Sequence, residues 1–387
     1  MKLIAKLLTG IVVGIIIGLL VSEFVIRVIV TFKELFGQFI GFAVPLIIIF
    51  YIVSGIASFG EQSGRMLGIT GGLAYSSTIL AGTLSFIVAL IVIPMFGARS
   101  GDGAEEASGF EPFFDLAIPP IVDVMTALVI AFVFGIGLTR IKSPTIRSFF
   151  DEGKEIIEGM IWKFIIPILP FYIGSIFAEL AADGSVFVTL RAFGLVLVTA
   201  VALHWVWLIV LYTVAGTYTG KNPFRSLKNM LPAYFTGLGT MSSAATIPVT
   251  VRATKSNKVS DGVADSTVPL CATIHLSGST ITLVMCSVAV TVLVNGLDQP
   301  TFGSMIPFIL MLGVVMIAAP GVPGGAVMAA LGLLSSMLGF DETALGIMIA
   351  LYMAQDSFGT AANVTGDGAI AMIVDKLVGK KSGENAA

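Results

Sequence analysis

The chain has 387 residues, of which 56% are hydrophobic and only 12% are charged. Its mean hydropathy is +1.00, whereas about one quarter of the residues of an ordinary soluble domain are charged. A soluble fold is therefore excluded, no nucleic-acid partner is expected, and the recurring uncharged apolar stretches indicate one membrane domain. The formal net charge of −3 says little by itself, because in a membrane protein the distribution of charge over the loops carries the information.

Apolar runs long enough to cross a hydrocarbon core of about 30 Å fill the first half of the chain. The first run follows Met1 closely and lacks the small-residue cleavage site of a signal peptide, so we expect it to remain as a span. Four later stretches are also apolar but carry Ser, Thr, Gly, Pro and Asn in their middles, which makes them poor lipid-facing helices. The conventional runs are 7–30, 36–58, 70–96, 117–139, 157–180 and 187–216, and the polar-centred stretches are 229–255, 265–296, 303–338 and 343–375.

The basic residues of the loops predict a cytoplasmic N-terminus, because Lys and Arg concentrate in cytoplasmic loops. With this orientation, Arg252, Lys255 and Lys258 return to the cytoplasm only if 229–255 enters and leaves the membrane on the same side. Residues 240–248 have the small, polar composition of a hairpin tip. We therefore predict a re-entrant helical hairpin at 229–255.

A second hairpin is predicted at 303–338, entering from the opposite face. Its centre, residues 318–325, contains prolines and glycines that cannot continue a helix. Together with interrupted spans at 265–296 and 343–375, the hairpins form an inverted repeat, whose non-helical parts must be buried in protein or line a polar cavity. A plain alternative is that the small residues only allow close helix packing, but packing alone requires neither the proline pairs nor two broken segments in corresponding positions.

The last stretch carries Asp356, Thr360, Asn363 and Asp367 at helical spacing, so these residues form one polar face. Each carboxylate costs at least about 2.5 kcal/mol at membrane depth, which predicts a cavity and a cation or cationic ligand group as partner. The alternative is a stripe that only hydrogen-bonds to neighbouring helices. That alternative lacks an intramembrane Lys or Arg to pair with either Asp.

In the stretch 265–296, the residues Thr273, His275 and Ser277 lie in an interruption rich in Gly and hydroxyl groups. Such an interruption exposes backbone carbonyls, the oxygen ligands that a hard monovalent cation prefers. We therefore predict a cation site here, with His275 either taking up a proton or serving only as a hydrogen-bonded structural residue. His204, beside two tryptophans, is interpreted as a packing or interfacial residue.

Four motifs follow one another in the second half of the chain: 242–250 (Ser-Ser-Ala-Ala-Thr-Ile-Pro-Val-Thr), 269–274 (Pro-Leu-Cys-Ala-Thr-Ile), 321–324 (Gly-Val-Pro-Gly) and 363–367 (Asn-Val-Thr-Gly-Asp). In this order they resemble the dicarboxylate/amino acid:cation symporter family, the glutamate transporter family. The resemblance is strong over the second half. In the first half it rests on the order and length of the spans.

The resemblance implies an all-α, elevator-type membrane transporter with about eight transmembrane helices and two opposed re-entrant hairpins, assembled as a homotrimer in the lipid bilayer. We expect it in a bacterial or archaeal inner membrane, with both termini cytoplasmic and no enzymatic activity. The implied domains are mainly scaffold and trimerisation helices at 1–225, a core transport domain at 226–376 and a cytoplasmic tail at 377–387. Within the first of these, 70–96 and 187–216 are candidates for a partial place in the transport domain.

The resemblance also implies roles for single residues. Asp356 would hold the substrate ammonium, Thr360 and Asn363 the region of its α-carboxylate, and Asp367 a sodium ion. The other candidates come from the hairpin tips and the broken span. They are Met241, Ser242, Ser243, Val322, Pro323, Gly324 and Gly359 for the substrate, and Asn363, Thr273, His275 and Ser277 for the cation.

Departures from the family pattern determine the predicted substrate and coupling. Gly359 stands where members with acidic substrates place an Arg, and Met241 stands at a second position often occupied by Arg, so no guanidinium remains for a side-chain carboxylate. His275 and Ser277 replace an Asn and an Asp of members with full sodium stoichiometry. We therefore predict a neutral-amino-acid-like member, a symporter for serine, threonine or alanine with no cofactor and reduced coupling, at one Na⁺ site.

Several alternatives stay open. H⁺ instead of Na⁺ would make the carrier proton-coupled, and an uncoupled carrier or exchanger would have the same pocket. Further alternatives are a dicarboxylate or acidic amino acid symporter and an ion channel, although a channel would surround an axial pore with repeated segments rather than close one site from two faces. An intramembrane enzyme ranks last, because no HExxH-like spacing or Ser-His constellation is evident along the chain.

Overall fold

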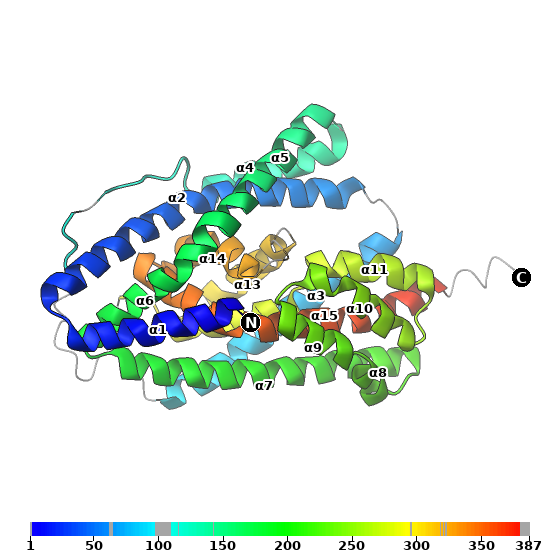
Figure 1. Cartoon of the computed structure of the whole chain (residues 1–387). Helices are drawn as coiled ribbons and strands as arrows, with labels where there is room; N and C mark the ends of the chain where they lie inside the picture. The colour runs from blue at the N-terminus through cyan, green and yellow to red at the C-terminus, as the bar shows by residue number, and fades with distance from the viewer. Residues whose placement is uncertain are drawn as a thin grey trace, which may run out of the picture.

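The computed structural model describes residues 2–61, 65–96, 110–114, 116–141, 143–294, 296–317, 319, 321 and 323–379. Within these residues all regular secondary structure is helical. Six helical segments of this part of the chain are long and apolar enough to cross a membrane, which confirms the predicted all-α membrane fold. Figure 1 shows an elongated bundle in which most helices run along the long axis.

Five helices of the first half form one group: α1 (Lys2–Leu20), α2 (Glu23–Glu61), α4 (Val124–Ile141), α5 (Pro144–Met160) and α6 (Ile166–Ala182). A π-helical turn, η2 (Ile161–Ile165), joins α5 to α6. In this group α2 packs against α4, α5 and α6, and α1 lies along α6. Figure 1 shows α1 and α2 diverging from the turn that connects them.

The second group is built around the last helix and consists of α3 (Arg65–Val92), α7 (Val186–Thr219), α8 (Pro223–Asn229), α9 (Leu231–Thr240), α10 (Ser243–Ser256), α11 (Asp261–Ile274), α12 (Ser277–Leu293), α13 (Phe302–Met316), α14 (Gly325–Leu338) and α15 (Glu342–Gly379). A short 3₁₀ helix, η1 (Ile93–Phe96), continues α3. Although α3 and α7 come early in the sequence, both pack against α12 and α15.

The two predicted hairpins are present. The first consists of α9 and α10 with its tip at Met241 and Ser242, and the second consists of α13 and α14 with its tip around Gly321. Figure 1 shows that they enter the bundle from opposite ends and meet near its middle. Pro248, which the sequence analysis placed in the first tip, lies inside α10.

Only one of the two predicted interrupted spans is interrupted. The stretch 265–296 is broken at His275 and Leu276, between the end of α11 and the start of α12. By contrast, α15 is a single helix, so the prediction of a break in 343–375 is wrong. This stretch contains no proline, and a glycine in a helix costs about 1 kcal/mol without removing a backbone hydrogen bond.

Two boundaries of the first half also differ from the expected ones. The expected span 7–30 contains the turn at Val21 and Ser22 that separates α1 from α2. The expected span 117–139 starts late, because Pro119 and Pro120 keep the chain extended until α4 begins. The helix then starts after Asp123, whose carboxylate accepts a hydrogen bond of 2.9 Å from the backbone N–H of Thr126.

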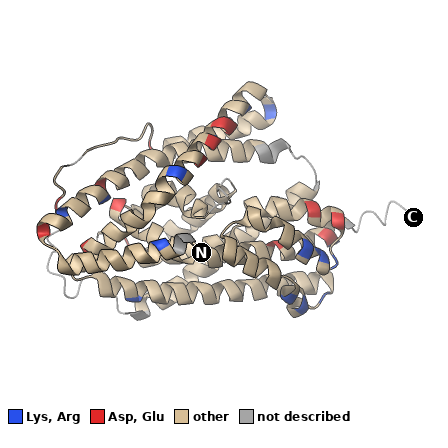
Figure 2. Ribbon diagram, viewed as in Figure 1, with Lys and Arg blue, Asp and Glu red and all other residues tan. Residues whose placement is uncertain are grey.

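Charged side chains gather at the ends of the bundle and on α5 (Figure 2), and long uncharged stretches lie between them. One group of charged residues connects the first hairpin to the broken helix. Lys255, at the end of α10, lies 2.9 Å from Asp265 and 3.2 Å from Asp261 of α11. Its hydrogen bonds to Asp265 and Asp261 raise the pKa of the Lys255 ammonium. Charged residues at the ends of the bundle and uncharged stretches between them are what is expected of a membrane-spanning bundle.

Candidate functional site

The polar face predicted on α15 turns into the interior of the second group. Asp356, Thr360, Asn363 and Asp367 are all buried, with exposed fractions of 5% or less. They occupy successive turns of one continuous helix. The backbone hydrogen bonds are therefore made within the helix, and only the side chains need hydrogen-bond partners outside it. The four residues therefore present a column of hydrogen-bonding groups to the hairpin tips and to the broken helix.

The two hairpin tips contact each other beside this column. The Ser242 side chain accepts from the backbone N–H of Ala245 at 3.3 Å, which caps α10, and its hydroxyl donates to the carbonyl oxygen of Gly321 at 2.8 Å. Met241 ends α9 with a left-handed backbone at φ 55°, a conformation that costs a non-glycine residue about 1 kcal/mol or more. A hydrogen bond thus joins the two tips, and a tight turn at Met241 forms the first of them.

Asp356 is bonded to the second hairpin. Its Oδ2 accepts a hydrogen bond of 2.7 Å from the backbone N–H of Gly324, immediately before α14. A helix N-terminus carries free N–H groups and the positive end of the helix dipole, so it is a favourable partner for a buried carboxylate. In this conformation the partner of Asp356 is a backbone N–H group of the hairpin tip, and the cationic partner predicted from the sequence stays a prediction.

Asn363 caps the break in the neighbouring helix. Its Oδ1 accepts from the backbone N–H groups of Gly278 at 2.8 Å and Ser279 at 3.2 Å, and its Nδ2 donates to Ser279 Oγ at 2.9 Å. These N–H groups belong to the first turn of α12 and would otherwise have no intrahelical partner. Gly278 also allows the close approach, since a methyl group there would meet the Gly359 carbonyl oxygen. One side chain of α15 thus stabilises the interruption.

A small closed cavity lies where these elements meet. Its volume is about 20 Å³, which is room for a water molecule but not for an amino acid. It can admit an amino acid only after the tips separate. The lining residues are Met241, Ser243, Ala272, Leu276, Ser279, Ala319, Gly321, Ala326, Tyr352, Asp356, Thr360 and Asn363.

A buried hydrogen-bonded chain lies one helical turn farther along α15. His275 Nδ1 lies 2.9 Å from Asp367 Oδ1, and His275 Nε2 lies 2.8 Å from Ser77 Oγ of α3. With Nδ1–H donating to the carboxylate, the Ser77 hydroxyl donates to Nε2 of a neutral imidazole. A Ser-His constellation therefore exists, contrary to the sequence analysis, which considered spacing along the chain and could not pair residues that lie so far apart in sequence.

The hydrogen-bonded chain leaves two buried oxygen atoms without a partner among the described residues, Asp367 Oδ2 and Ser277 Oγ. Thr273, by contrast, is exposed and its hydroxyl donates to the carbonyl oxygen of Leu270 at 2.8 Å. Of the predicted cation ligands, His275 thus contacts Asp367 and Ser277 is buried two residues after His275, whereas Thr273 is exposed.

Only some of the predicted substrate residues line the cavity. Met241, Ser243 and Thr360 line the cavity, and Pro323 is half-buried in the second tip. Gly359 faces the broken helix instead, because a methyl group there would lie 3.4 Å from the backbone of Ser279. Val322 lies outside the described residues.

Sequence reasoning missed several residues at the site. Tyr352 lines the cavity and stands one turn before Asp356, so an extension of the polar stripe by four residues would have found it. Ser77 stands in a run of four hydroxyl residues, 75–78, which is a local polar signal. Tyr212, whose hydroxyl donates to the Thr365 carbonyl at 2.7 Å, is not marked by its spacing to the polar stripe. His204 is not a simple packing residue, since its Nε2 lies 3.0 Å from the Gly278 carbonyl oxygen at the break.

Comparison with known proteins places this fold and site in a family. The model of the sodium:dicarboxylate symporter family matches residues 3–377. Excitatory amino acid transporter 1 of Ambystoma tigrinum is 29% identical over 272 residues, which are 68% of this chain and 49% of that protein. Excitatory amino acid transporter 3 of Mus musculus is 29% identical over 267 residues, 67% of this chain and 50% of that protein.

A relative named for neutral substrates is similar at a comparable level. Neutral amino acid transporter B(0) of Oryctolagus cuniculus is 26% identical over 253 residues, 64% of this chain and 46% of that protein. The chain thus spans about half the length of the curated relatives it matches. Because the family model covers nearly the whole chain, and the fold has the predicted opposed hairpins and all-helical membrane architecture, the chain belongs to the sodium:dicarboxylate symporter family, whose members are membrane transporters and not enzymes.

Proposed function

We propose that this chain is a symporter for small neutral amino acids such as serine, threonine or alanine. The observation that supports this substrate class is the charge of the closed cavity. Among the described residues that line it, Asp356 is the one charged side chain. A substrate ammonium would pair with Asp356, whereas a side-chain carboxylate would be buried without a countercharge, at a cost of several kcal/mol.

The remaining lining groups suit a small zwitterion. Asn363 Nδ2 uses one N–H for Ser279 Oγ and retains a second N–H that would donate to the substrate α-carboxylate. The hydroxyls of Thr360 and Ser243 also line the cavity, and the apolar side chains of Ala272 and Ala326 offer no countercharge to a substrate side chain. The lining groups thus favour an uncharged side chain.

The proposed transport cycle requires the closed tips to open. An amino acid that reaches Asp356 would replace the Gly324 N–H as its partner and would break the bond between Ser242 and Gly321. We further propose an elevator movement of the group around α15 against the group around α2, in a homotrimer. Each of these two groups packs mainly within itself, and α3 and α7 belong to the group around α15. This packing supports such a division.

We propose reduced sodium coupling at one site. Asp367 Oδ2 and Ser277 Oγ are buried oxygens open to a cation, but Asp367 Oδ1 is already bonded to His275. The side chain at 277 adds a hydroxyl and no carboxylate, so two or three sodium ions would leave excess positive charge in a medium of low dielectric constant. The specific alternative, favoured by the bond between His275 and Asp367, is a proton-coupled carrier.

The proposed location is a bacterial or archaeal inner membrane with both termini in the cytoplasm. This orientation places the basic link between α10 and α11 on the cytoplasmic side, as the distribution of Lys and Arg in membrane proteins favours. The first hairpin would then enter from the cytoplasm and the second from outside.

The experiment that tests the function is reconstitution of the purified chain into vesicles, with a panel of labelled amino acids under an imposed sodium gradient and then a proton gradient. Saturable uptake of serine, threonine or alanine, and none of aspartate or glutamate, is expected. Tight, saturable aspartate binding at neutral pH would contradict the proposed substrate.

A titration of log affinity against log sodium concentration separates the coupling schemes. A slope near one supports a single sodium site. A slope near zero, with a pH dependence that is lost in His275→Asn, supports the proton-coupled alternative. A slope near three contradicts the argument from Ser277.

A further inference from the structure

A large apolar cleft lies far from the substrate site, between α1, α2 and α6. We propose that it is a binding site for an acyl chain of an anionic phospholipid, whose headgroup lies at Lys6 and Lys163. The cleft has a volume of about 810 Å³, within the range of about 300–1,000 Å³ typical of small-molecule sites. This site is independent of the proposed substrate and coupling.

The cleft exists because α1 and α2 contact α6 in different ways. Methyl groups at Gly10, Gly14 and Gly18 of α1 would meet the carbonyl oxygens of Pro170, Gly174 and Ala178 of α6, respectively. The two backbones therefore touch, as small residues allow in membrane helices. Since α2 diverges from α1 while it still packs on α6 (Figure 1), an open wedge remains whose floor is α6.

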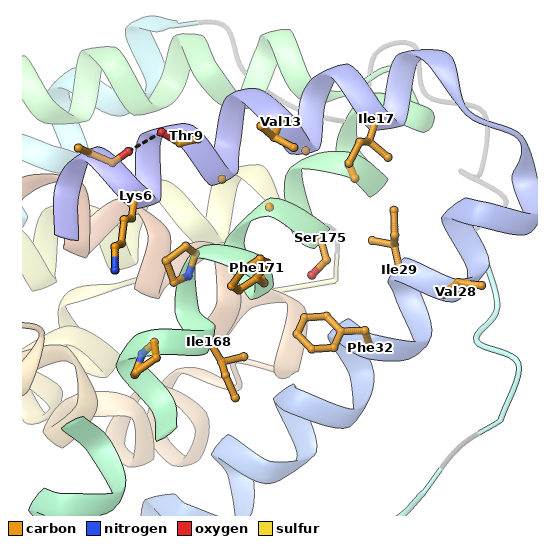
Figure 3. Close-up of a pocket in the computed structure, with 17 residues that line it drawn as sticks. Lys6, Thr9, Val13, Ile17, Val28, Ile29, Phe32, Ile168, Phe171 and Ser175 are labelled. Carbon is orange, nitrogen blue, oxygen red and sulfur yellow. Dashed lines mark hydrogen bonds between the residues drawn. The ribbon is translucent and has the colours of Figure 1, made fainter. Parts of the chain in front are cut away.

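The walls of the wedge are almost entirely apolar. Figure 3 shows the ring of Phe32 pointing from α2 toward α6, where Phe171 and Ile168 lie, and Val13 on α1. The two hydroxyl groups in the lining are satisfied within their own helices, because Thr9 donates to the Ala5 carbonyl at 2.8 Å and Ser175 donates to the Tyr172 carbonyl at 2.6 Å. An occupant of this part of the cleft should therefore be apolar.

One end of the cleft is basic. Lys6 is the one charged side chain among the lining residues, and Figure 3 shows it at the end where α1 begins. The α6 carbonyl oxygens nearest to Gly10, Gly14 and Gly18 belong to residues whose numbers are higher by 160, so Lys6 is level with Ile166. The exposed Lys163 lies three residues before that, in the π-helical turn η2.

Three observations favour a phospholipid as the occupant. Two of its three helices, α2 and α6, belong to segments long and apolar enough to span a membrane, so lipid tails are the apolar molecules expected beside it. Trp162, 41% exposed, lies beside Lys163, and Trp marks the level of the headgroups. Two ammonium groups at that level favour an anionic headgroup, and each adds about fivefold in affinity.

The test is native mass spectrometry of the purified full-length chain, titrated with phosphatidylglycerol and with phosphatidylcholine of the same acyl chains. We expect about 25-fold tighter binding of phosphatidylglycerol. The double variant Lys6→Gln/Lys163→Gln should reduce this preference to about twofold or less, because the tail site remains while the headgroup partners are gone. Lys228→Gln, an exposed lysine of α8, is the matched control and should keep the preference.

A second pair of variants tests the tail site. Val13 and Val12 are neighbours on α1 with exposed fractions of 46% and 55%, but only Val13 lines the cleft. Val13→Phe should weaken the binding of both lipids at least about fivefold, and Val12→Phe should leave it unchanged. The proposal is overturned if the parent shows no preference for phosphatidylglycerol, or if the lysine pair does not affect it. It is also overturned if Val13→Phe changes the subunit number while lipid binding stays the same, which would make the cleft a subunit interface.

Discussion

The broken helix α11–α12 and the continuous helix α15 carry similar residues, yet only the first is interrupted. The break leaves the backbone N–H groups of Gly278 and Ser279 without helical partners, and Asn363 of α15 accepts from both. One helix therefore offers backbone groups and the other offers side chains. The comparison teaches that an interruption at membrane depth is stable when an unbroken neighbour caps it.

The largest effect is expected on substrate binding, when Asp356 of α15 is replaced. Asp356→Asn should weaken binding of the transported neutral amino acid at least about 100-fold, or about 2.7 kcal/mol. Asp356 is the one charged lining group, and an ammonium buried without its partner costs about 3–5 kcal/mol. Isothermal titration calorimetry on the purified variant measures the change, and its elution volume shows whether assembly is intact.

A matched control is available on the same helix. Asp375 bonds to Ser260 at 2.6 Å, outside the cavity, so Asp375→Asn should keep the affinity within about twofold of the parent. If Asp356→Asn itself binds within about threefold of the parent, which is about 0.65 kcal/mol, then Asp356 does not hold the ammonium.

The next largest effect is expected on stability, when the cap of the broken helix is removed. Asn363→Ala leaves two buried N–H groups unsatisfied, at about 1–3 kcal/mol each, and should lower the free energy of unfolding by about 2–6 kcal/mol. Asn363→Asp keeps an acceptor for both groups and should lose less. Denaturant unfolding in detergent compares the two variants, and an Ala variant within about 0.5 kcal/mol of the parent would contradict the capping role.

A smaller change should follow a guanidinium placed in the cavity. Met241 lines the cavity and is 3% exposed, so Met241→Arg should shift the ratio of aspartate to serine affinity about tenfold toward aspartate, or about 1.4 kcal/mol. Competition binding measures the ratio, with Met241→Gln as the uncharged control of similar length.

The same assay tests Gly359→Arg, for which the family pattern predicts a gain of affinity for acidic substrates. A side chain there would start in ordinary contact with the Ser279 backbone, at 3.4 Å, so it would begin against the broken helix and we expect a smaller gain in aspartate affinity than in Met241→Arg. A gain in Gly359→Arg without one in Met241→Arg would show that the substrate side chain lies against the broken helix.

Sequence alone predicted the parts of the fold that depend on local chemistry. The hairpin tips at Met241 and Gly321 follow from residues that cannot continue a helix or that favour a turn, and the break at His275 follows from a local run of Gly and hydroxyl residues. The polar stripe from Asp356 to Asp367 follows from helical spacing. Each of these signals lies within about a dozen residues.

The rest depends on which helices meet, and sequence spacing does not contain that information. Thr273 and Ser277 looked equivalent in the broken span, yet the side chain of Thr273 is exposed and that of Ser277 is buried. The continuity of α15 also escaped prediction, because its polar residues resemble those of the broken helix. Proline does not locate the break either, since Pro269 lies inside α11 and the interruption comes at His275 and the residue after it. Ser77 was missed because its partner, His275, is 198 residues away.

The smallest expected effect concerns this last contact, through which α3 supports the broken helix. Ser77→Ala removes the hydroxyl that lies 2.8 Å from His275 Nε2 and leaves a buried ring nitrogen without that partner, so the free energy of unfolding should fall by about 1 kcal/mol. Ser76→Ala, at the exposed neighbouring position, should change it by less than about 0.5 kcal/mol. Denaturant unfolding of both variants in the same detergent measures the difference. If the two variants are equally stable, the Ser77 hydroxyl contributes nothing to the break, and the support of α11–α12 comes from other contacts, such as those of Asn363 on α15 and His204 on α7.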